Sequence, residues 1–280
     1  MSPAAATTLF GVIGKPVAGN PTQEMVEAAF VAAGVDARYV SLEVEPEDLA
    51  DALRGVRALN LAGINVTVPH KVAVVPLLDR ITPGASISGA VNCIKREGGE
   101  LVGDNTDGKG FLDSLRAVAE PSGSSAVVIG AGGAARAIAT ELALAGAARV
   151  TVVNRSAQRA AEVAAAVSAG TGVESVPLEL TDGWTVPAEA DVVVQATTVG
   201  MDDPEERLPL RWSESSGVAA DVVIAPETAF LHDAAAHGYR ALNGLGMLVE
   251  QAVIGVRWWT GVEPDRAVMR AALERELGLV

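Results

Sequence analysis

The sequence predicts an α/β protein with two domains, and three observations lead to this prediction. The chain has 280 residues, more than a single hydrophobic core usually organises. Short apolar runs rich in β-branched residues alternate with helical patterns along almost the whole chain. Hydrophobic residues make up 49% of the chain, which is enough to build sizeable cores and argues against wholesale disorder.

The first half alternates strand and helix patterns. The run TLFGVIG is followed by a helix pattern that starts near Gln23, and Gly98 and Gly99 separate two strand-like pieces as in a hairpin. The junction GNPTQEM suggests a helix cap, with Asn20 as N-cap, Pro21 at the first helical position and Gln23 completing a capping-box-like pair. We expect strands near 9–13, 39–44 and 64–68, and helices near 23–33, 47–59 and 108–119.

The second half begins after AEPSGSS, a stretch typical of a linker. The segment from Ala126 to Arg155 predicts a strand, a glycine turn, a helix and a second strand. Strands near 191–195 and 219–224 follow, and helices near 245–260 and 265–277 end the chain. This helical tail could pack back on the first domain.

The charge balance narrows the classes of partner. Lys and Arg number 21 and Asp and Glu number 35, so the net charge is −14. Such a surface repels phosphate backbones and anionic membranes, so we expect neither nucleic-acid nor membrane binding. An anionic small molecule would need local basic residues to hold it.

Cysteine usage and the N-terminus favour a cytoplasmic location. Cys93 is the single cysteine and cannot form an internal disulfide, which suits a reducing compartment. MSPAAATTLF has neither a basic segment nor a long apolar segment, so we expect no signal peptide. The three histidines lack ligand spacing with cysteines or carboxylates, so we expect no metal site.

The segment GAGGAA fits the dinucleotide pattern G-x-G-x-x-A. It follows an apolar strand and opens a helix, which is the context that makes this pattern informative. Gly130 allows the tight turn, Gly132 lets the backbone approach a pyrophosphate, and Ala135 allows close packing of helix and strand. The alternative is a glycine turn that serves packing alone.

The end of the second strand indicates which dinucleotide is bound. An acidic residue there favours NAD, but this chain has NRSAQR with Asn154, Arg155, Ser156 and Arg159. Guanidinium groups bind phosphate oxygens in a bidentate fork, so the segment predicts a 2′-phosphate and therefore NADP. The alternative is a solvated helix start.

Polar side chains also follow strands in the first half, in NVTVPHK and in AVNCIKREGGELVGDNTDG. Loops after strands commonly gather the site of an α/β domain. The first stretch ends at Lys71, and the second carries Asn92, Asn105, Thr106 and Asp107. Taken alone, Lys71 and Asp107 are typical of an exposed lysine and a helix cap.

Six segments in order resemble the shikimate dehydrogenase family: GINVTVPHK, SGAVN, GDNTDG, GAGGAARA, NRSAQRA and NGLGMLVEQA. The resemblance implies NADP-dependent reduction of 3-dehydroshikimate to shikimate in aromatic amino acid biosynthesis. It implies a substrate-binding domain over 1–106 and 244–280 and a Rossmann-like NADP-binding domain over 107–243, with the C-terminal helices returning to the first domain. The partner would be a small cyclic hydroxy-carboxylate, and the enzyme a monomer or homodimer.

The resemblance also implies roles for individual residues. Lys71 and Asp107 would be the catalytic pair. The substrate-binding residues would be Asn20, Thr22, Thr67, Asn92 and Gln251. The cofactor-binding residues would be Gly130, Gly132, Gly133, Ala134, Asn154, Arg155, Ser156, Arg159, Thr197, Gly244 and Met247.

Three departures from the family pattern involve four positions. Asn20 and Thr22 stand where the family usually has two serines that hold the substrate carboxylate, Ile224 stands where it has a tyrosine, and Gln195 stands where it has an asparagine. These departures leave open a paralogue that acts on a related acid, such as quinate or an aminoshikimate. A non-catalytic NADP-binding regulator is a second alternative, against which the presence of Lys71 and Asp107 argues.

Overall fold

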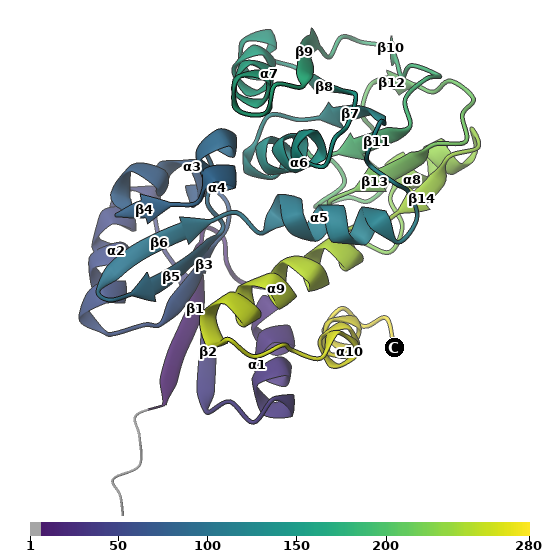
Figure 1. Ribbon diagram of the computed structural model, residues 1–280. Coiled ribbons are helices and arrows are strands. Elements are labelled where there is room, and N and C mark those ends of the chain that lie inside the picture. The colour runs from purple at the N-terminus through teal and green to yellow at the C-terminus, as the bar shows by residue number, and fades with distance from the viewer. Residues whose placement is uncertain (1–6) are drawn as a thin grey trace, which may run out of the picture. The chain divides into compact units, whose positions relative to one another are not determined.

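The computed structural model describes residues 7–280, and two compact units divide the chain. Unit 1 comprises the chain up to Thr106 together with Gln251–Val280, and unit 2 comprises Asp107–Glu250 (Figure 1). Residues 1–6 carry part of the expectation about a signal peptide and lie outside the described residues.

Unit 1 contains a mixed sheet in the order β2-β1-β3-β5-β6-β4 (Figure 1). Strands β1, β2 and β3 are parallel, whereas β5 runs antiparallel to β3. Gly98 and Gly99 have φ values of 58° and 94° and form the turn of the β5–β6 hairpin, as expected from the sequence. The strands are β1 (Thr8–Gly14), β2 (Ala37–Glu43), β3 (Gly63–Val66), β4 (Arg80–Ile81), β5 (Cys93–Glu97) and β6 (Glu100–Asp104).

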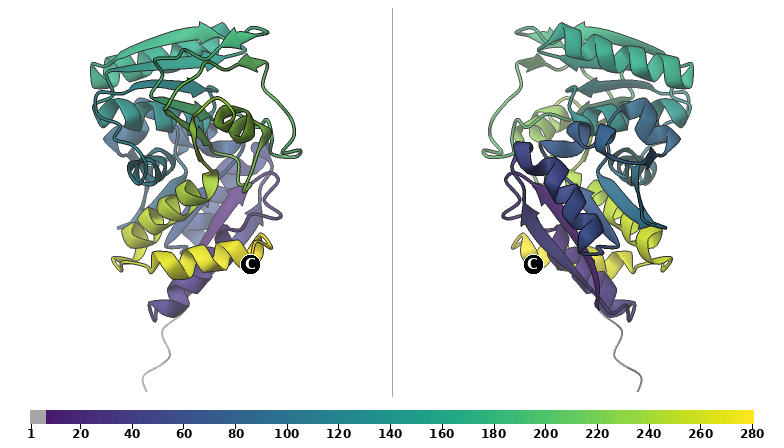
Figure 2. Two further views of the ribbon diagram at one scale, coloured as in Figure 1. Left: turned by 90° about the vertical axis from the view of Figure 1, so that its right-hand side faces the viewer. Right: turned by 90° about the vertical axis from the view of Figure 1, so that its left-hand side faces the viewer.

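Helices cover both faces of this sheet. Leu49, Leu53 and Val56 of α2 share a helix face and pack in one cluster with Ile13 and Ile64 of the strands. On the other side, helix α10 packs against α1, as Figure 2 shows. The helices of unit 1 are α1 (Thr22–Ala32), α2 (Leu49–Ala58), α3 (His70–Ala73), α4 (Pro83–Ser88), α10 (Arg266–Glu276), the C-terminal part of α9 (Gly244–Thr260), and the 3₁₀ turns Pro46–Asp48 and Val75–Leu77.

The C-terminal helices return to the first unit, as the resemblance implied. Trp259 of α9 stacks on Phe10 of β1 with ring centroids 5.1 Å apart, and its Nε1 donates a hydrogen bond to the carbonyl of Ile94 at 3.0 Å. A Cβ at Gly63 would collide with the Trp259 indole, so glycine lets this ring lie flat against the sheet. The indole therefore packs in the core, and its N–H has the partner that a buried tryptophan needs.

Unit 2 contains a parallel sheet in the order β14-β13-β11-β7-β8-β9, the order of a doubly wound dinucleotide-binding fold. A separate two-stranded sheet pairs β10 with β12. The strands are β7 (Ser125–Ile129), β8 (Arg149–Asn154), β9 (Glu174–Glu179), β10 (Trp184–Thr185), β11 (Val192–Gln195), β12 (Leu210–Arg211), β13 (Val218–Asp221) and β14 (Arg240–Leu242).

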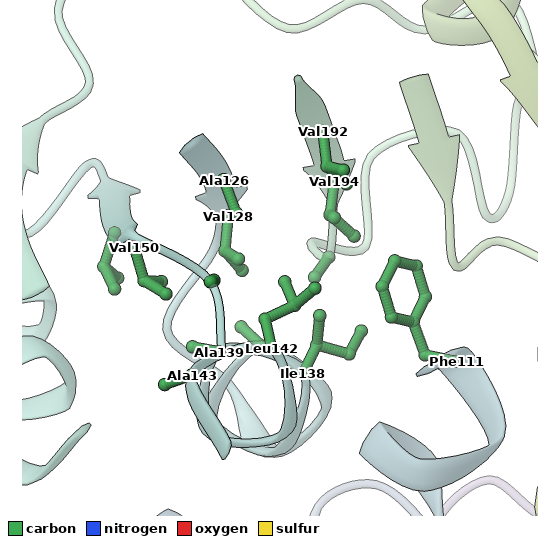
Figure 3. Packing of buried hydrophobic residues seen from close by; sticks show 14 of the residues in the cluster. Phe111, Ala126, Val128, Ile138, Ala139, Leu142, Ala143, Val150, Val192 and Val194 are labelled. Carbon is green, nitrogen blue, oxygen red and sulfur yellow. The ribbon is translucent and has the colours of Figure 1, made fainter. Parts of the chain in front are cut away.

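The core of unit 2 explains why its central strands are almost wholly apolar. Figure 3 shows Ile138 and Leu142 of α6 directed toward Val128 of β7 and Val194 of β11. Strands covered on both faces read as continuous Val and Ala runs, as here. The helices of unit 2 are α5 (Asp107–Arg116), α6 (Gly133–Leu144), α7 (Ala157–Thr171), α8 (Ala229–Ala235) and the start of α9.

The stretch AEPSGSS, expected to be a linker, is a turn within unit 2 that connects α5 to β7. Gly123 has a φ of 77°, and the Ser124 hydroxyl donates to the carbonyl of Pro121 at 2.6 Å. Pro, Gly and Ser suit any tight surface turn, so this composition does not distinguish a turn inside a unit from a connection between units.

Candidate active site

The glycine turn of GAGGAA lies where the strand order of unit 2 reverses, between β7 and β11. Ligands of doubly wound sheets bind in the crevice at this point. Gly130 has a φ of 125°, and a Cβ on it would lie 2.5 Å from the carbonyl oxygen of Ala196 after β11. Only glycine fits there, because a side chain would strain the backbone and strike the neighbouring strand end.

Gly132 differs from Gly130 because a Cβ on it would meet no described protein atom within 4 Å. It precedes α6, whose first residues Gly133 and Ala134 are partly exposed, whereas Ala135 is fully buried. An open approach to the N–H groups of a helix N-terminus is the arrangement that receives a pyrophosphate. The residues present therefore fit a dinucleotide.

The end of β8 carries the basic residues expected to bind a 2′-phosphate. Ser156 is the N-cap of α7 and accepts the Arg159 N–H at 3.3 Å, and Asn154 Nδ2 donates to the Ser156 carbonyl at 3.1 Å. Arg159 reaches the Ala131 carbonyl of the glycine turn at 3.5 Å, and Arg155 is exposed. The guanidinium groups of Arg155 and Arg159 therefore belong to residues just after β8, and that of Arg159 reaches the glycine turn.

Gln195 organises the loop that holds Thr197. Its Oε1 accepts the Thr197 N–H, and its Nε2 donates to the Val199 carbonyl at 2.7 Å. The Thr197 hydroxyl in turn accepts the Val199 N–H at 3.1 Å. Gln195, which departs from the family pattern, therefore uses both its amide oxygen and its amide nitrogen to hold the loop after β11.

Helix α9 begins in a tight site within unit 2. A Cβ at Gly244 would lie 2.6 Å from the Val223 carbonyl, and a Cβ at Gly246 would collide with Ser114 of α5. Met247 packs into the core of the unit and is 9% exposed. Met247 and Gln251 are four residues apart, so they lie on the same face of this helix.

In unit 1, the polar residues of the sequence motifs meet at one edge of the sheet. Ile13 pairs with Val66, so the loops after β1 and β3 leave the sheet side by side, and Lys15 N–H donates to Val68 at 2.9 Å. The Val66 N–H donates to the Asn92 carbonyl at 2.8 Å. We call this border the carboxyl edge of unit 1 and define it as residues 14–22, 43–45, 67–73, 90–92 and 104–106 together with Gln251.

A buried network of neutral polar groups occupies the carboxyl edge. The Thr106 N–H donates to Asn92 Oδ1 at 2.7 Å, and Asn92 Nδ2 lies 3.0 Å from Thr106 Oγ1 and 3.3 Å from Gln251 Oε1. The three residues are 3%, 0% and 7% exposed in the order Asn92, Thr106 and Gln251. Segments far apart in sequence therefore present amide and hydroxyl groups together.

Tyr39 and Asn65 extend this network through two further hydrogen bonds. Tyr39 donates its hydroxyl to Asn65 Oδ1 at 2.7 Å, and Asn65 Nδ2 donates to the Asn92 carbonyl at 3.0 Å. Burial raises the pKa of the Tyr39 phenol well above its usual value, so the hydroxyl stays protonated as a donor.

Lys71 lies in the short helix α3, which follows β3 and the cis peptide bond before Pro69. The preceding residue, His70, is buried and bonds the Val44 carbonyl through Nε2 at 2.8 Å, and the Lys71 carbonyl accepts the Val91 N–H at 2.8 Å. These bonds tie α3 to the strands on either side. Lys71 itself is partly exposed, as is Thr67 at the end of β3.

Asp107 is the first residue of unit 2 and follows Thr106 of the network directly. It begins α5 and is 5% exposed. The pairing of Asp107 with Lys71 stays a prediction.

The loop before α1 differs from the expected capping box. The helix starts at Thr22, and Asn20 Oδ1 accepts the Thr22 N–H at 3.0 Å in an Asx turn. Gln23 does not return to Asn20; its Oε1 accepts the Ser41 N–H of edge strand β2 at 3.1 Å. The box was wrong because β2 offers Gln23 an unpaired backbone donor, which sequence spacing does not reveal.

Sequence reasoning did not single out Asp221 and Thr228 in unit 2. Asp221 ends β13, accepts the Val223 N–H at 2.9 Å, and accepts the Thr228 hydroxyl at 2.7 Å. Burial raises the pKa of Asp221 to about 6 despite these two bonds. An acidic residue at the end of an apolar strand run was the available signal, and the pair shapes the loop that carries Ile224, which is 39% exposed.

Residues 7–280 contain no group of three or more His, Cys, Asp or Glu side chains placed to hold a metal ion. Within the same residues, no helix combines the length and the apolar character that crossing a bilayer requires.

Family models match three parts of the chain. Residues 12–94 match the shikimate dehydrogenase substrate binding domain, residues 115–201 match shikimate / quinate 5-dehydrogenase, and residues 244–274 match the shikimate 5'-dehydrogenase C-terminal domain. Together these ranges cover the glycine turn, the network residue Asn92 and helix α9.

Similar proteins extend the match to nearly the full length. The shikimate dehydrogenase (NADP(+)) of Geobacter metallireducens is 45% identical over 96% of this chain and 98% of its own. The ligand-free 5-ketofructose reductase of Gluconobacter sp. strain CHM43 is 46% identical, with a TM-score of 0.89 and coverage of 96% and 98%. Shikimate 5-dehydrogenase of Thermus thermophilus, solved with NADP(H) and shikimate, is 37% identical, with a TM-score of 0.83 and coverage of 96% and 99%. With these identities over almost its entire length, the chain belongs to the shikimate dehydrogenase family.

Proposed function

We propose that this protein catalyses the NADP-dependent, reversible oxidation of shikimate to 3-dehydroshikimate. The observation that carries the proposal is the buried network of Asn92, Thr106 and Gln251 at the carboxyl edge of unit 1. Amide groups both donate and accept, so such a network suits the ring hydroxyls of a polyhydroxylated substrate. The near full-length similarity to curated shikimate dehydrogenases supports the same conclusion.

Unit 2 would hold NADP. The N-terminus of α6, with Gly130, Gly132, Gly133 and Ala134, would receive the pyrophosphate. The 2′-phosphate would contact residues at the end of β8, and the nicotinamide would lie near residues of two later segments. These residues are Asn154, Arg155, Ser156 and Arg159 for the phosphate, and Thr197, Gly244 and Met247 for the nicotinamide.

The chain's own residues perform the proton chemistry in this proposal. NADPH, when bound, supplies the hydride. Lys71 Nζ donates a proton to the substrate oxygen as negative charge develops there, and takes it back in the oxidation direction. Asp107 stabilises the ammonium form and orients it. Thr67, Asn92 and Gln251 bind the ring hydroxyls, and Asn20 and Thr22 face the substrate from the loop before α1.

Steady-state kinetics test the proposal directly. NADPH oxidation is followed with 3-dehydroshikimate, and NADP⁺ reduction with shikimate, quinate and an aminoshikimate. We expect the highest kcat/KM with the shikimate pair. A higher value with quinate or an aminoshikimate would assign the chain to a paralogous activity. NADPH binding without turnover of any ketone or alcohol would instead indicate a regulator.

A second candidate is reduction of 5-ketofructose, which lacks a carboxylate. The 46% identity to a 5-ketofructose reductase favours it. Asn20 and Thr22 also replace the two serines that the family pattern uses to hold the substrate carboxylate, and Ile224 replaces a tyrosine. The ketone therefore belongs in the same panel, and a kcat/KM above that for 3-dehydroshikimate would make it the main activity.

Location and assembly are further parts of the proposal. We propose a cytoplasmic enzyme of aromatic amino acid biosynthesis that works as a monomer or homodimer, without nucleic acid as a partner. Size-exclusion chromatography with light scattering measures the assembly state. A stable tetramer would contradict it.

A further inference from the structure

The charged side chains of the carboxyl edge of unit 1 leave little attraction for a substrate anion. The basic residues in its segments are Lys15, His70 and Lys71, and the acidic residues are Glu43, Glu45 and Asp104. Lys15 Nζ contacts Glu43 Oε1 at 2.5 Å and Glu45 Oε1 at 2.8 Å.

The other two basic residues, His70 and Lys71, also have other roles. His70 bonds the Val44 carbonyl, and Lys71 is the proposed proton donor. A substrate carboxylate at this edge would therefore depend on neutral donors, in a chain whose net charge is −14.

Two backbone N–H groups in the loop before α1 donate to side-chain oxygen atoms of the chain itself. Asn20 Oδ1 accepts the Thr22 N–H at 3.0 Å, and Glu43 Oε2 approaches the Val17 N–H at 3.4 Å. Free N–H groups at a helix start are the usual receptor for an anion. Asn20 fills one of them and offers its own amide group, which bonds a hydroxyl as readily as a carboxylate.

The first turn of α1 carries Glu24, which is exposed. A negative charge there opposes the attraction of the helix dipole for a second anion. The remaining polar groups of the edge, in Asn92, Thr106 and Gln251, are neutral and suit hydroxyl groups.

We propose that this site recognises its substrate through hydroxyl groups and accepts neutral polyhydroxy ketones, with the carboxylate adding little to kcat/KM. The inference rests on the proposed function, because it concerns the substrate of the same NADPH-dependent ketone reduction. It names the substrate class from charges and hydrogen bonds within unit 1.

A matched pair of substrates tests the proposal. 3-Dehydroshikimate and its methyl ester share the ring, the ketone and the hydroxyls, and differ in the charge of the carboxyl group. We expect the ester to retain kcat/KM within about tenfold of the acid, the ratio that a difference of about 1.4 kcal/mol produces. Turnover of 5-ketofructose in the same range supports the neutral class further.

The outcomes separate this inference from the proposed function. Turnover of the acid with a loss of roughly 100-fold or more for the ester overturns the inference and leaves the proposed function intact. Turnover of the ester without the acid supports the inference and overturns the shikimate assignment. No turnover of any ketone overturns both.

Two variants locate the effect. Asn20→Ala removes the oxygen that accepts the Thr22 N–H and frees this donor for an anion, so the ratio of kcat/KM for acid over ester should rise by about tenfold. Glu24→Gln removes the charge in the first turn and should raise the ratio by roughly two- to fivefold. Glu276→Gln, an exposed position at the end of α10, is the matched control and should leave the ratio unchanged. Unchanged ratios in both edge variants would contradict the proposal.

Discussion

Units 1 and 2 build their parts of the candidate site in different ways. In unit 2, the glycine turn is formed by consecutive residues after β7, and the basic residues lie just after β8, the neighbouring strand. In unit 1, Asn65, Asn92, Thr106 and Gln251 come from segments far apart in sequence and meet in one buried network. The first arrangement is local and uses mainly backbone, whereas the second is non-local and uses side chains.

This difference explains why the loop before α1 departs from the family pattern while the glycine turn does not. A turn that needs a positive φ and an open helix start allows few alternatives, and the pattern here is complete from Gly130 to Ala135. The loop before α1 imposes no such backbone requirement at Asn20 or Thr22. Substrate recognition can therefore change while the cofactor-binding turn stays the same.

The largest effect is expected from Lys71→Ala in unit 1. Loss of the proton donor should lower kcat by roughly 10²- to 10⁴-fold, while the Kd for NADPH changes by less than about twofold. Stopped-flow turnover and fluorescence titration of NADPH measure the two quantities. Lys95→Ala, a lysine of β5 that pairs with Glu97, is the control. Retained turnover in the Lys71 variant would rule out its catalytic role.

Two glycines of the same turn should respond differently. Gly130→Ala forces a side chain onto a backbone with φ of 125° and against Ala196, so it should cost about 2–5 kcal/mol of folding free energy. Gly132→Ala meets no described protein atom and should leave the fold stable, yet weaken NADPH binding by about tenfold or more. Urea unfolding and NADPH titration distinguish them. Unchanged NADPH binding in Gly132→Ala would refute the assignment of Gly132 to the cofactor.

Asp221 should make the stability of the protein pH-dependent. Its folded pKa of about 6 exceeds the ordinary aspartate pKa of 3.8, so between these values the native state holds a proton that the unfolded chain has released. This stabilisation is complete below the unfolded pKa and is lost as pH rises through the folded pKa, by at most about 3 kcal/mol. In Asp221→Asn, the free energy of unfolding should no longer show this decrease as the pH rises from 4 to 6. An unchanged slope would contradict the assignment, and Asp202→Asn is the exposed control.

Removing a side chain of the buried network should lower the free energy of unfolding more than removing one from the loop before α1. Asn92→Ala removes the oxygen that accepts the Thr106 N–H and one of the donors to Gln251 Oε1, and should cost about 1–3 kcal/mol. Asn20→Ala removes one partly exposed bond and should cost about 0.5–1 kcal/mol. Thermal or urea unfolding compares the two. A larger loss for Asn20 would reverse the proposed contrast between network and loop.

The smallest effect concerns the choice of dinucleotide. Arg155→Ala should narrow the preference for NADP over NAD by roughly tenfold, because a charge-assisted bond to the 2′-phosphate is lost. Arg149→Ala, at the opposite end of β8 and paired with Glu174, is the matched control. The ratio of kcat/KM for the two cofactors measures the change. A ratio equal to that of the unaltered protein would remove Arg155 from the phosphate site.

Local patterns in the sequence predicted most of the elements. Apolar alternation located β1, β2 and β3, the glycine pair located the β5–β6 hairpin, and the strand–glycine–helix order located α6. The capping box at Asn20 failed because the partner of Gln23 is Ser41 of β2. The Asp221–Thr228 pair went unassigned because the side-chain bonds that involve it depend on how the loop after β13 folds.

By itself, the sequence determined the α/β class, the doubly wound dinucleotide pattern and the family, since each depends on periodicity or on motifs of neighbouring residues. The tertiary structure decided which polar groups are already satisfied. Asn20 Oδ1 accepts a hydrogen bond from the Thr22 N–H, and Lys15 forms ion pairs with Glu43 and Glu45. The physical reason is that a side chain's capacity to bind a ligand depends on the partners that folding brings to it, and those partners come from distant strands.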